Sequence, residues 1–484
     1  DHRDLHSFPT RRSSDLKISE HSGIIKDTSE EARLNNITAR QPVLNDLMVE
    51  MCSASDSEVL KSIVKWYRSN EAWSPKLVNA ANGFYYSNSA KIKDPEKIRD
   101  IYGKKLSISV SRLEKYVECP FSYFVQYGLK ARERRIYKLS PPDLGSLMHE
   151  SLYNFSGRLK EAGVTWRDMD PGWAEEKIAE IVDEIVDSSQ GSIFKSSKRY
   201  QYIEENVKNN LKRSIKLIAE HIKRGGFVPE GYELNFGYDG QYPPITVELD
   251  SGEEVSLIGK IDRVDTLSKN GETYIRIVDY KSGNKEFKIS DVYYGLQLQL
   301  LIYLDAILTE IGRKVQEKVL PAGVLYFKLD DPMIKTEGEM DEVKIQAAIM
   351  KALKMNGLIL KNLEIISSMD SNIGEDNPGA SDIIPASVNK DNSISSRSSC
   401  ADIAQFDLLR SYVRDTMKKI CRRILEGSIE ISPYKKKNAT PCQYCTYSSI
   451  CQFDAGIKGN RYRILKEKKE EELWKLIEAE AGSN

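Results

Sequence analysis

Two hydrophobic periodicities divide this chain. Apolar side chains recur every three or four residues in six regions, which predicts helices within 17–106, 107–135, 143–159, 173–224, 292–308 and about 402–426. Apolar and polar residues alternate in short runs elsewhere, which predicts strands at 232–238, 245–249, 258–281 and 322–330. Helices, a three-strand meander, a further helix and a further strand, in that order, predict an α/β core with a mixed sheet flanked by helices.

The first helical region contains no chemistry that the sequence reveals. Its periodic apolar positions are Leu47, Met51, Leu60, Ile63, Val64 and Trp66. Asp56 is the expected cap at the start of one of its helices. We expect this region to be the helical remnant of a larger domain.

The strongest strand signal lies in residues 258–283. An Asn-Gly dipeptide at 270–271 separates two β-rich runs, which is typical of a tight hairpin. Asp279 and Lys281 are two residues apart, so their side chains project from one face, and the hairpin can bring Asp262 close to them. Metal-assisted phosphodiester cleavage uses this set, because carboxylates bind hard cations and a lysine steadies an attacking water or a developing negative charge.

A simpler interpretation of these residues is also available. A surface strand with ordinary salt bridges would show the same Asp-x-Lys pattern, which favours that interpretation when taken alone. His149 leaves a similar choice, because it follows Leu144 and Met148 at helical spacing beside an apolar face. A lone histidine in such a place is usually structural. The other motifs of the chain therefore have to decide whether these residues form a catalytic site or are structural.

Length, charge and cysteine usage restrict the class of protein. The 484 residues are too many for one compact core and predict two to four domains. Formal net charge is -1, which excludes a globally basic nucleic-acid binder. No run of 18 apolar residues occurs, so we expect no membrane partner. The seven uneven cysteines do not resemble a secreted disulfide framework and favour a reducing, cytoplasmic location.

One local basic run stands out against this balanced charge. It consists of Lys130, Arg132, Arg134 and Arg135. A phosphate backbone would fit such a run, and a solvated charged face is the alternative.

Three cysteines near the C-terminus have the spacing of metal ligands. Cys442, Cys445 and Cys451 form C-x2-C-x5-C, and a short C-x2-C bite fits two thiolates on one metal or cluster. No histidine follows His221, so the fourth ligand has to come from Cys52, Cys119, Cys400 or Cys421. Cys119 interrupts an amphipathic helix just before the predicted strands and is attractive for that reason. Spacing alone fits both zinc and iron–sulfur.

The order of these motifs resembles a known nuclease family. The motifs are Cys119, His149 in LGSLMHE, Asp262 in GKIDRVD, Asp279-Tyr280-Lys281 in VDYKSG, Gln299 and Tyr303 in QLLIY, and Cys442, Cys445 and Cys451. They resemble the C-terminal nuclease domain of the AddB family, in the RecB-like branch of the PD-(D/E)XK nucleases. The resemblance covers about 107–453. It implies a PD-(D/E)XK nuclease core with a helical N-terminal remnant and a C-terminal Fe-S staple.

The resemblance also implies roles for individual residues. The implied Mg2+ ligands are His149, Asp262, Asp279 and the main-chain carbonyl of Tyr280. Lys281 would orient the attacking water, while Gln299 and Tyr303, four apart on one helix face, would position that lysine or the scissile strand. The implied 4Fe-4S ligands are Cys119, Cys442, Cys445 and Cys451. The cluster would have a structural role and would support binding of DNA ends.

The family further implies partners and a layout for the chain. We expect DNA, as double-strand ends and single strands, and a helicase–nuclease A subunit that forms a heterodimer with this one. The complex would process double-strand breaks for recombination, and this subunit would cut the 5′-ended strand. No G-x-x-x-x-G-K-S/T phosphate loop occurs, so ATP binding would belong to a missing region.

The expected layout has six parts. Residues 1–16 resemble translated sequencing-adapter DNA, which would make the chain an N-terminally truncated fragment. The other parts are a helicase-like remnant at 17–106, the nuclease domain at 107–365, a flexible connection at 366–400 with a short ordered piece at 383–385, the cysteine segment at 401–460 and a charged helical tail at 461–484.

Two rival functions remain open at this stage. One is a stand-alone PD-(D/E)XK exonuclease of the CRISPR-associated kind, which also combines a cluster with these motifs. The other is a non-catalytic DNA-binding scaffold with a zinc site, in which the acidic residues are structural.

Overall fold

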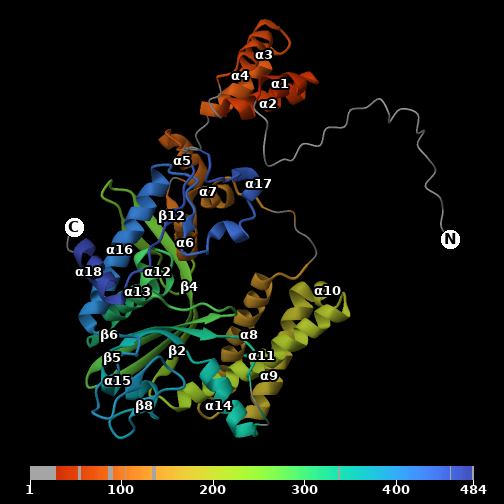
Figure 1. Cartoon of the computed structure of the whole chain (residues 1–484). Coiled ribbons are helices and arrows are strands. Elements are labelled where there is room, and N and C mark those ends of the chain that lie inside the picture. The colour runs from red at the N-terminus through yellow and green to blue at the C-terminus, as the bar shows by residue number, and fades with distance from the viewer. Residues whose placement is uncertain are drawn as a thin grey trace, which may run out of the picture. The chain divides into compact units, whose positions relative to one another are not determined.

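The computed structural model describes most of the chain (Figure 1). The described residues are 29–52, 56–85, 91–103, 105–132, 134, 138–335, 338, 340–457 and 459–481. The chain divides into two compact units, Asp1–Ser87 and Asn88–Asn484. The segment 1–16, predicted to be an artefact, lies outside the described residues. Among the described helices, none combines the length and apolar character needed to cross a bilayer.

The first unit is helical, as its periodicity predicted. Its elements are α1 (Glu30–Asn35), α2 (Arg40–Cys52), α3 (Glu58–Ser69), α4 (Ser74–Asn82) and the short helix η1 (Gly83–Tyr85). Its core contains Val43, Leu44, Leu47, Leu60, Tyr67 and Leu77. The expected core positions Met51 and Trp66 are exposed, because Tyr67 rather than Trp66 points into this small core.

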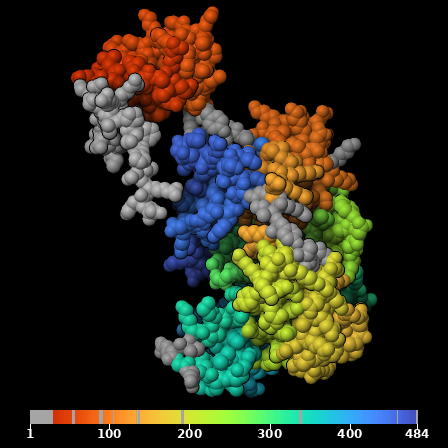
Figure 2. Space-filling view, turned by 90° about the vertical axis from the view of Figure 1, so that its right-hand side faces the viewer, coloured from red at the N-terminus to blue at the C-terminus, as the bar shows by residue number. Residues whose placement is uncertain are grey.

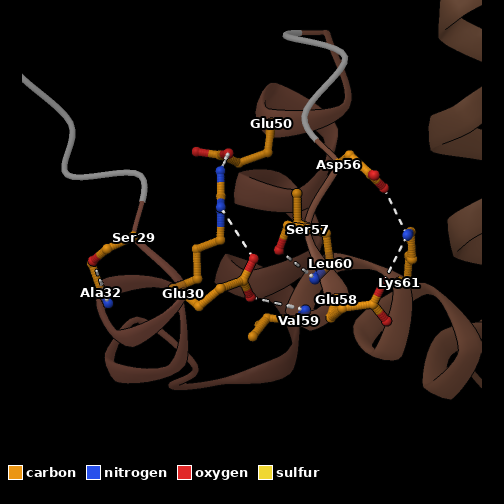
Figure 3. Close-up of polar contacts among 11 residues, drawn as sticks. Ser29, Glu30, Ala32, Glu50, Asp56, Ser57, Glu58, Val59, Leu60 and Lys61 are labelled. Carbon is orange, nitrogen blue, oxygen red and sulfur yellow. Dashed lines mark hydrogen bonds and ion pairs between the residues drawn. The ribbon is translucent and has the colours of Figure 1, made fainter.

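Polar contacts fix the ends of these helices (Figure 3). The hydroxyl of Ser57 accepts a hydrogen bond from the backbone N–H of Leu60 and caps α3. The predicted cap was Asp56, which instead forms an ion pair with Lys61 at 2.7 Å. Ser57 is the cap because it directly precedes the first residue of α3, where a side-chain oxygen can satisfy a free N–H of the first turn.

The second unit is built on an eight-stranded mixed sheet in the order β1-β4-β5-β6-β7-β10, with β2 and β3 also paired to β4. The strands are β1 (Leu106–Ser109), β2 (Val228–Phe236), β3 (Ile245–Glu248), β4 (Glu254–Lys269), β5 (Glu272–Lys281), β6 (Lys318–Lys328), β7 (Asn356–Leu360) and β10 (Cys400–Ala401). Antiparallel β4–β5 and parallel β5–β6 pairs form its centre. The mixed α/β fold that the sequence predicted is therefore confirmed.

The expected three-strand meander is wrong. β3 and β2 both pair with β4, which has 16 residues and is long enough to hold two partners in succession along one edge. β1 and β5 pair with successive parts of β4 in the same way. β4 is consequently the strand on which the whole sheet is assembled.

Helices cover both faces of the sheet (Figure 1). One group consists of α8 (Pro141–Glu161), α9 (Pro171–Ile185), the π-helix η3 (Val186–Gln190), α10 (Gly191–Phe194) and α11 (Lys198–Lys223). The other group consists of α12 (Ile289–Tyr293), α13 (Gln299–Lys314), α16 (Ile403–Leu425) and α18 (Glu470–Ala481). Along β5, Asp279 faces α13, whereas Tyr280 faces Phe327 of β6, against which His221 of α11 packs.

The predicted helix at 292–308 is interrupted. α12 ends at Tyr293, and α13 begins only at Gln299. Gly295 has φ of 75°, a conformation that ends a helix and suits glycine. The side chain of Gln297 then bonds to backbone atoms of Lys288 and Glu286 in the loop. The break makes Gln299 the first residue of a helix, which matters for the site below.

The segment 366–400 differs from the flexible connection that its composition predicted. It includes the end of α15 (Leu363–Met369) and the short strands β8 (Gly379–Ala380) and β9 (Ser387–Val388), and it follows α14 (Glu342–Ala352) and β7. Ile383 and Ile384 are fully buried, and the Ser381 hydroxyl accepts hydrogen bonds from both of their N–H groups. A few buried apolar residues therefore order a stretch that is polar on average.

The beginning and the end of the second unit lie side by side (Figures 1 and 2). The early elements are α5 (Pro95–Tyr102), α6 (Val110–Glu118), α7 (Pro120–Tyr123) and the π-helix η2 (Phe124–Gly128). The late elements are β11 (Tyr434–Lys435), η4 (Pro441–Tyr444), α17 (Ser448–Cys451) and β12 (Arg463–Ile464). Tyr116 donates to the carbonyl of Ser428 at 3.0 Å, and Phe121 donates its N–H to the carbonyl of Glu430 at 3.2 Å.

Candidate active site

The β4–β5 hairpin forms as the sequence predicted. Asn270 and Gly271 both have positive φ, at 54° and 77°, which is the conformation of a tight turn between twisted strands. Asp279 and Lys281 form an ion pair on one face at the end of β5. Asp262 of β4 accepts a hydrogen bond from the N–H of Tyr280 at 2.7 Å. The hairpin therefore brings the two aspartates and the lysine together.

His149 reaches the same place from α8. Its Nδ1 lies 3.3 Å from a carboxylate oxygen of Asp262 and 4.0 Å from one of Glu233. One ligand atom from each of these three residues lies within 4.8 Å of the others. These side chains come from α8, β2 and β4, so the arrangement depends on tertiary packing.

Glu233 is a site residue that sequence reasoning missed. The β2–β4 register places it opposite Asp262, and it is only 7% exposed. Its φ of 52° is in the left-handed region, which is costly for a residue with a side chain. It forms an ion pair with Lys260. In the sequence Glu233 alternates with Tyr232 and Leu234 and would be placed on the polar face of its strand, so no sequence signal could have found it.

Burial and charge shift the pKa values of this group. Burial and the neighbouring Asp262 carboxylate raise the pKa of Asp279 to about 6, in spite of Lys281 beside it. Burial opposes the charged forms of His149 and Lys281, but the adjacent aspartates outweigh it and raise the pKa of each. Two buried carboxylates that repel one another favour a cation between them.

The donor set fits a hard divalent cation. It contains Glu233, Asp262 and the imidazole of His149, and carboxylate oxygens are the ligands that Mg2+ and Mn2+ prefer. Asp279, a ligand that the sequence predicted, lies outside this group of three. Burial and the charge of Asp262 together raise the pKa of Asp279, and a bound cation would offset both effects by stabilising the ionised carboxylate. The main-chain carbonyl of Tyr280 is the remaining predicted ligand. The backbone N–H of the same residue donates a hydrogen bond to Asp262.

Gln299 and Tyr303 support the hairpin from α13. The side-chain amide of Gln299 donates to Asp279 at 3.1 Å, and the Tyr303 hydroxyl accepts from the N–H of Lys260 at 3.3 Å. Neither hydrogen bond reaches Lys281, the residue that the sequence had suggested as a partner. A Cβ at Gly259 would lie 2.6 Å from the Tyr303 hydroxyl, so only glycine leaves room for this tyrosine.

A second constellation surrounds a cavity of about 170 Å³. Cys119, Cys442, Cys445 and Cys451 all line it, although Cys119 is 323 residues from Cys442 in the sequence. Burial raises the pKa of the Cys119 and Cys451 thiols. The rival fourth ligands lie elsewhere, with Cys421 fully buried in α16, Cys400 on β10 and Cys52 in the first unit.

The four sulfur atoms are not tightly clustered. Among the described residues, no three cysteine sulfurs lie within 4.8 Å of one another. A tetrahedral zinc ion with Zn–S bonds near 2.3 Å needs its sulfurs about 3.8 Å apart. An iron–sulfur cluster binds each thiolate to a separate iron and spreads the sulfurs more widely.

The basic run lies next to this cysteine segment. Lys130, Arg132 and Arg134 are exposed, and Arg135 lies outside the described residues. Tyr447 donates a hydrogen bond to the carbonyl of Ala131 at 3.0 Å, which connects the run to the loop between Cys445 and Cys451.

Comparison with known proteins identifies the class. The model of the PD-(D/E)XK nuclease superfamily matches residues 107–452. That span covers the β4–β5 hairpin, the helices α8 and α13 that contact it, and the four cysteines. The chain therefore belongs to this superfamily.

Individual relatives agree with the narrower resemblance that the motifs predicted. The chain is 52% identical over 467 residues to the B subunit of the ATP-dependent helicase/deoxyribonuclease of Clostridium botulinum (strain Loch Maree / Type A3), covering 95% of this chain and 40% of the relative. It is 45% identical over 467 residues to the protein of the same name from Clostridium tetani, covering 96% and 40%. The chain thus spans about two fifths of the length of these curated relatives.

Proposed function

We propose that this chain is the Mg2+-dependent DNA exonuclease portion of a two-subunit helicase–nuclease that processes double-strand breaks for homologous recombination. In this proposal it cuts the 5′-ended strand, works in the cytoplasm and pairs with a helicase–nuclease A subunit. The names of the relatives support the helicase–nuclease assignment. The superfamily match supports phosphodiester hydrolysis.

One observation carries the proposal. Asp262, Asp279 and Lys281 converge with His149 of α8 at one buried place, where the repulsion between the aspartates favours a cation. A surface strand with ordinary salt bridges would leave these carboxylates exposed, yet Asp262 is 8% and Asp279 2% exposed. Burial of such a charged set is typical of a functional site.

In this proposal each residue has a definite task. The metal ligands are His149, Glu233, Asp262, Asp279 and the carbonyl of Tyr280. Bound Mg2+ lowers the pKa of a coordinated water and neutralises charge on the phosphate. The Lys281 ammonium, held beside Asp279, orients the attacking water. Gln299 and Tyr303 keep Asp279 and β4 in place.

The four cysteines hold a structural 4Fe-4S cluster in this proposal. The single cavity that all four cysteines line supports a shared site, and the resemblance of the motifs to the AddB family favours a cluster over zinc. The cluster ties α6 to the C-terminal loops and offsets the entropy of closing a loop of more than 300 residues. The neighbouring run beginning at Lys130 would contact the phosphate backbone of DNA ends.

The central experiment measures cleavage of 5′- and 3′-labelled DNA with and without Mg2+. Asp279→Ala and Lys281→Ala should abolish Mg2+-dependent cleavage while leaving folding and DNA binding intact. The matched controls are Glu272→Gln and Lys318→Ala, which remove an exposed ion pair at the other end of β5. Full activity in both site variants would remove the assignment, and release of label from the 3′ end alone would reverse the polarity.

A further inference from the structure

Glu114 of α6 is a buried carboxylate next to the site, and neither the motifs nor the predicted ligand sets include it. Its side chain is 13% exposed. One oxygen, Oε1, accepts hydrogen bonds from two backbone N–H groups, those of Leu298 at 2.8 Å and Gln299 at 3.0 Å. The other oxygen lies 3.8 Å from the ammonium of Lys285. These three partners of Glu114 all belong to the segment that follows β5.

These contacts make Glu114 the cap of α13. The first N–H groups of a helix lack partners within the helix, and a nearby side-chain oxygen usually satisfies them. The residue before α13 is Leu298, which has no side-chain oxygen and makes no side-chain cap. Glu114 supplies the missing acceptor from 184 residues upstream. A carboxylate also suits the positive end of the helix dipole.

The capped residue is the one that holds Asp279. Gln299 is the first residue of α13, so the position of its backbone depends directly on the cap. Its side-chain amide donates to Asp279 at 3.1 Å. An unbroken chain of hydrogen bonds therefore runs from Glu114, through the backbone and side chain of Gln299, to a predicted metal ligand.

A lysine pair lies on the other side of the same carboxylate. The ammonium groups of Lys281 and Lys285 lie 5.8 Å and 5.5 Å from the centre of the Tyr326 ring. Glu114 is within 3.8 Å of Lys285, and Lys281 is paired with Asp279. Glu114 thus provides a negative charge beside Lys285, while Asp279 provides one beside Lys281.

We propose that Glu114 is a positioning residue of the nuclease site, which fixes the start of α13 and thereby the orientation of Asp279 toward the metal. This inference rests on the proposed function. It also gives α6 a defined task, because the same helix ends next to Cys119, one of the four cysteines around the cavity. Partners that orient metal ligands in this way typically contribute about 10- to 100-fold to metal affinity or activity.

Two substitutions of Glu114 separate positioning from general stability. Glu114→Ala removes both acceptor contacts, whereas Glu114→Gln keeps one oxygen that can accept from the same N–H groups. We expect Glu114→Ala to lower kcat by about 10-fold or more and to raise the Mg2+ concentration at half-maximal activity by about 10-fold. Glu114→Gln should restore most of both quantities. KM for DNA should change little, because Glu114 does not contact the substrate.

The matched control is Asp170→Ala, which removes the carboxylate that caps α9 at 2.8 Å from the N–H of Trp173. It should lower stability by a comparable amount without changing the Mg2+ dependence. Binding of Mn2+ to the protein without DNA, measured by electron paramagnetic resonance, provides a second reading and should weaken about 10-fold in Glu114→Ala.

The outcomes separate the two proposals. A wild-type chain that is active, together with a folded Glu114→Ala variant of unchanged kcat and Mg2+ dependence, would overturn the role of Glu114 alone. Equal shifts in Mg2+ dependence for Glu114→Ala and Asp170→Ala would also overturn it. A wild-type chain that neither cleaves DNA nor binds Mn2+ would overturn the nuclease function and this inference together.

Discussion

Asp279→Asn should stabilise the metal-free protein while abolishing its activity. Burial and the Asp262 carboxylate raise the pKa of Asp279 from an ordinary 3.8 to about 6. Because the folded state holds this proton more tightly than the unfolded state, the ionised form destabilises the fold as pH rises from about 4 through 6. A shift of roughly two units corresponds to about 3 kcal/mol at pH 8.

Asparagine removes the charge but keeps an oxygen that can accept from Gln299, which donates to Asp279 at 3.1 Å. We therefore expect Asp279→Asn to raise the free energy of unfolding by as much as about 3 kcal/mol at pH 8. The gain should vanish near pH 4, where Asp279 itself is protonated. Urea denaturation in EDTA at the two pH values measures this difference.

Glu272→Gln is the control, because hydrogen bonds from Tyr274 and Lys318 lower the pKa of this exposed carboxyl and its charge does not oppose folding. Added Mg2+ should then stabilise the wild type by mass action and leave Asp279→Asn unchanged. A metal-free Asp279→Asn variant that is no more stable than wild type at pH 8 would refute the reasoning. It would mean that the ionised Asp279 carboxylate does not destabilise the metal-free fold.

Three further predictions test the supporting structure. Gly259→Ala should destabilise the protein by about 1–3 kcal/mol in thermal unfolding, because its Cβ would lie 2.6 Å from the Tyr303 hydroxyl, whereas Gly312→Ala, with open space around it, should not. Glu233→Gln should weaken Mn2+ binding, and unchanged binding in titration calorimetry would exclude it as a ligand. Wild-type protein purified anaerobically should be brown. Cys119→Ser should lose this colour, whereas the control Cys421→Ser should keep it. A colourless wild type with stoichiometric zinc would contradict the cluster.

Local features of the site could be predicted from the sequence because they depend on neighbouring residues. The turn at Asn270-Gly271 needs only two residues that tolerate positive φ, and both have it. Asp279 and Lys281 share a face because strand side chains alternate. The sequence also predicted that the helix at about 402–426 ends near Gly427. α16 ends at Leu425, and Gly427 has φ of 72°.

Other features depended on partners far away in the chain. The sequence predicted a short ordered piece at 383–385, and Ile383 and Ile384 are buried there, but the polar composition of 366–400 did not show that the residues around them would be ordered too. The helix predicted across 292–308 breaks at Gly295, since apolar periodicity alone does not show where a positive φ is needed. That break decides the site geometry, because it places Gln299 at a helix start beside Asp279.

The sequence by itself determined the hairpin, the identity of its two aspartates and its lysine, and the spacing of Cys442, Cys445 and Cys451, whereas Cys119 was one of four candidates that the family resemblance favoured. Only the tertiary structure decided which residues complete the site. It brought Glu233 opposite Asp262 across a strand pair, and it placed Glu114 at the start of α13 from 184 residues away. The physical reason is that backbone alternation and turn conformation are local, whereas burial and the capping of a helix by a distant side chain exist only after the chain has packed.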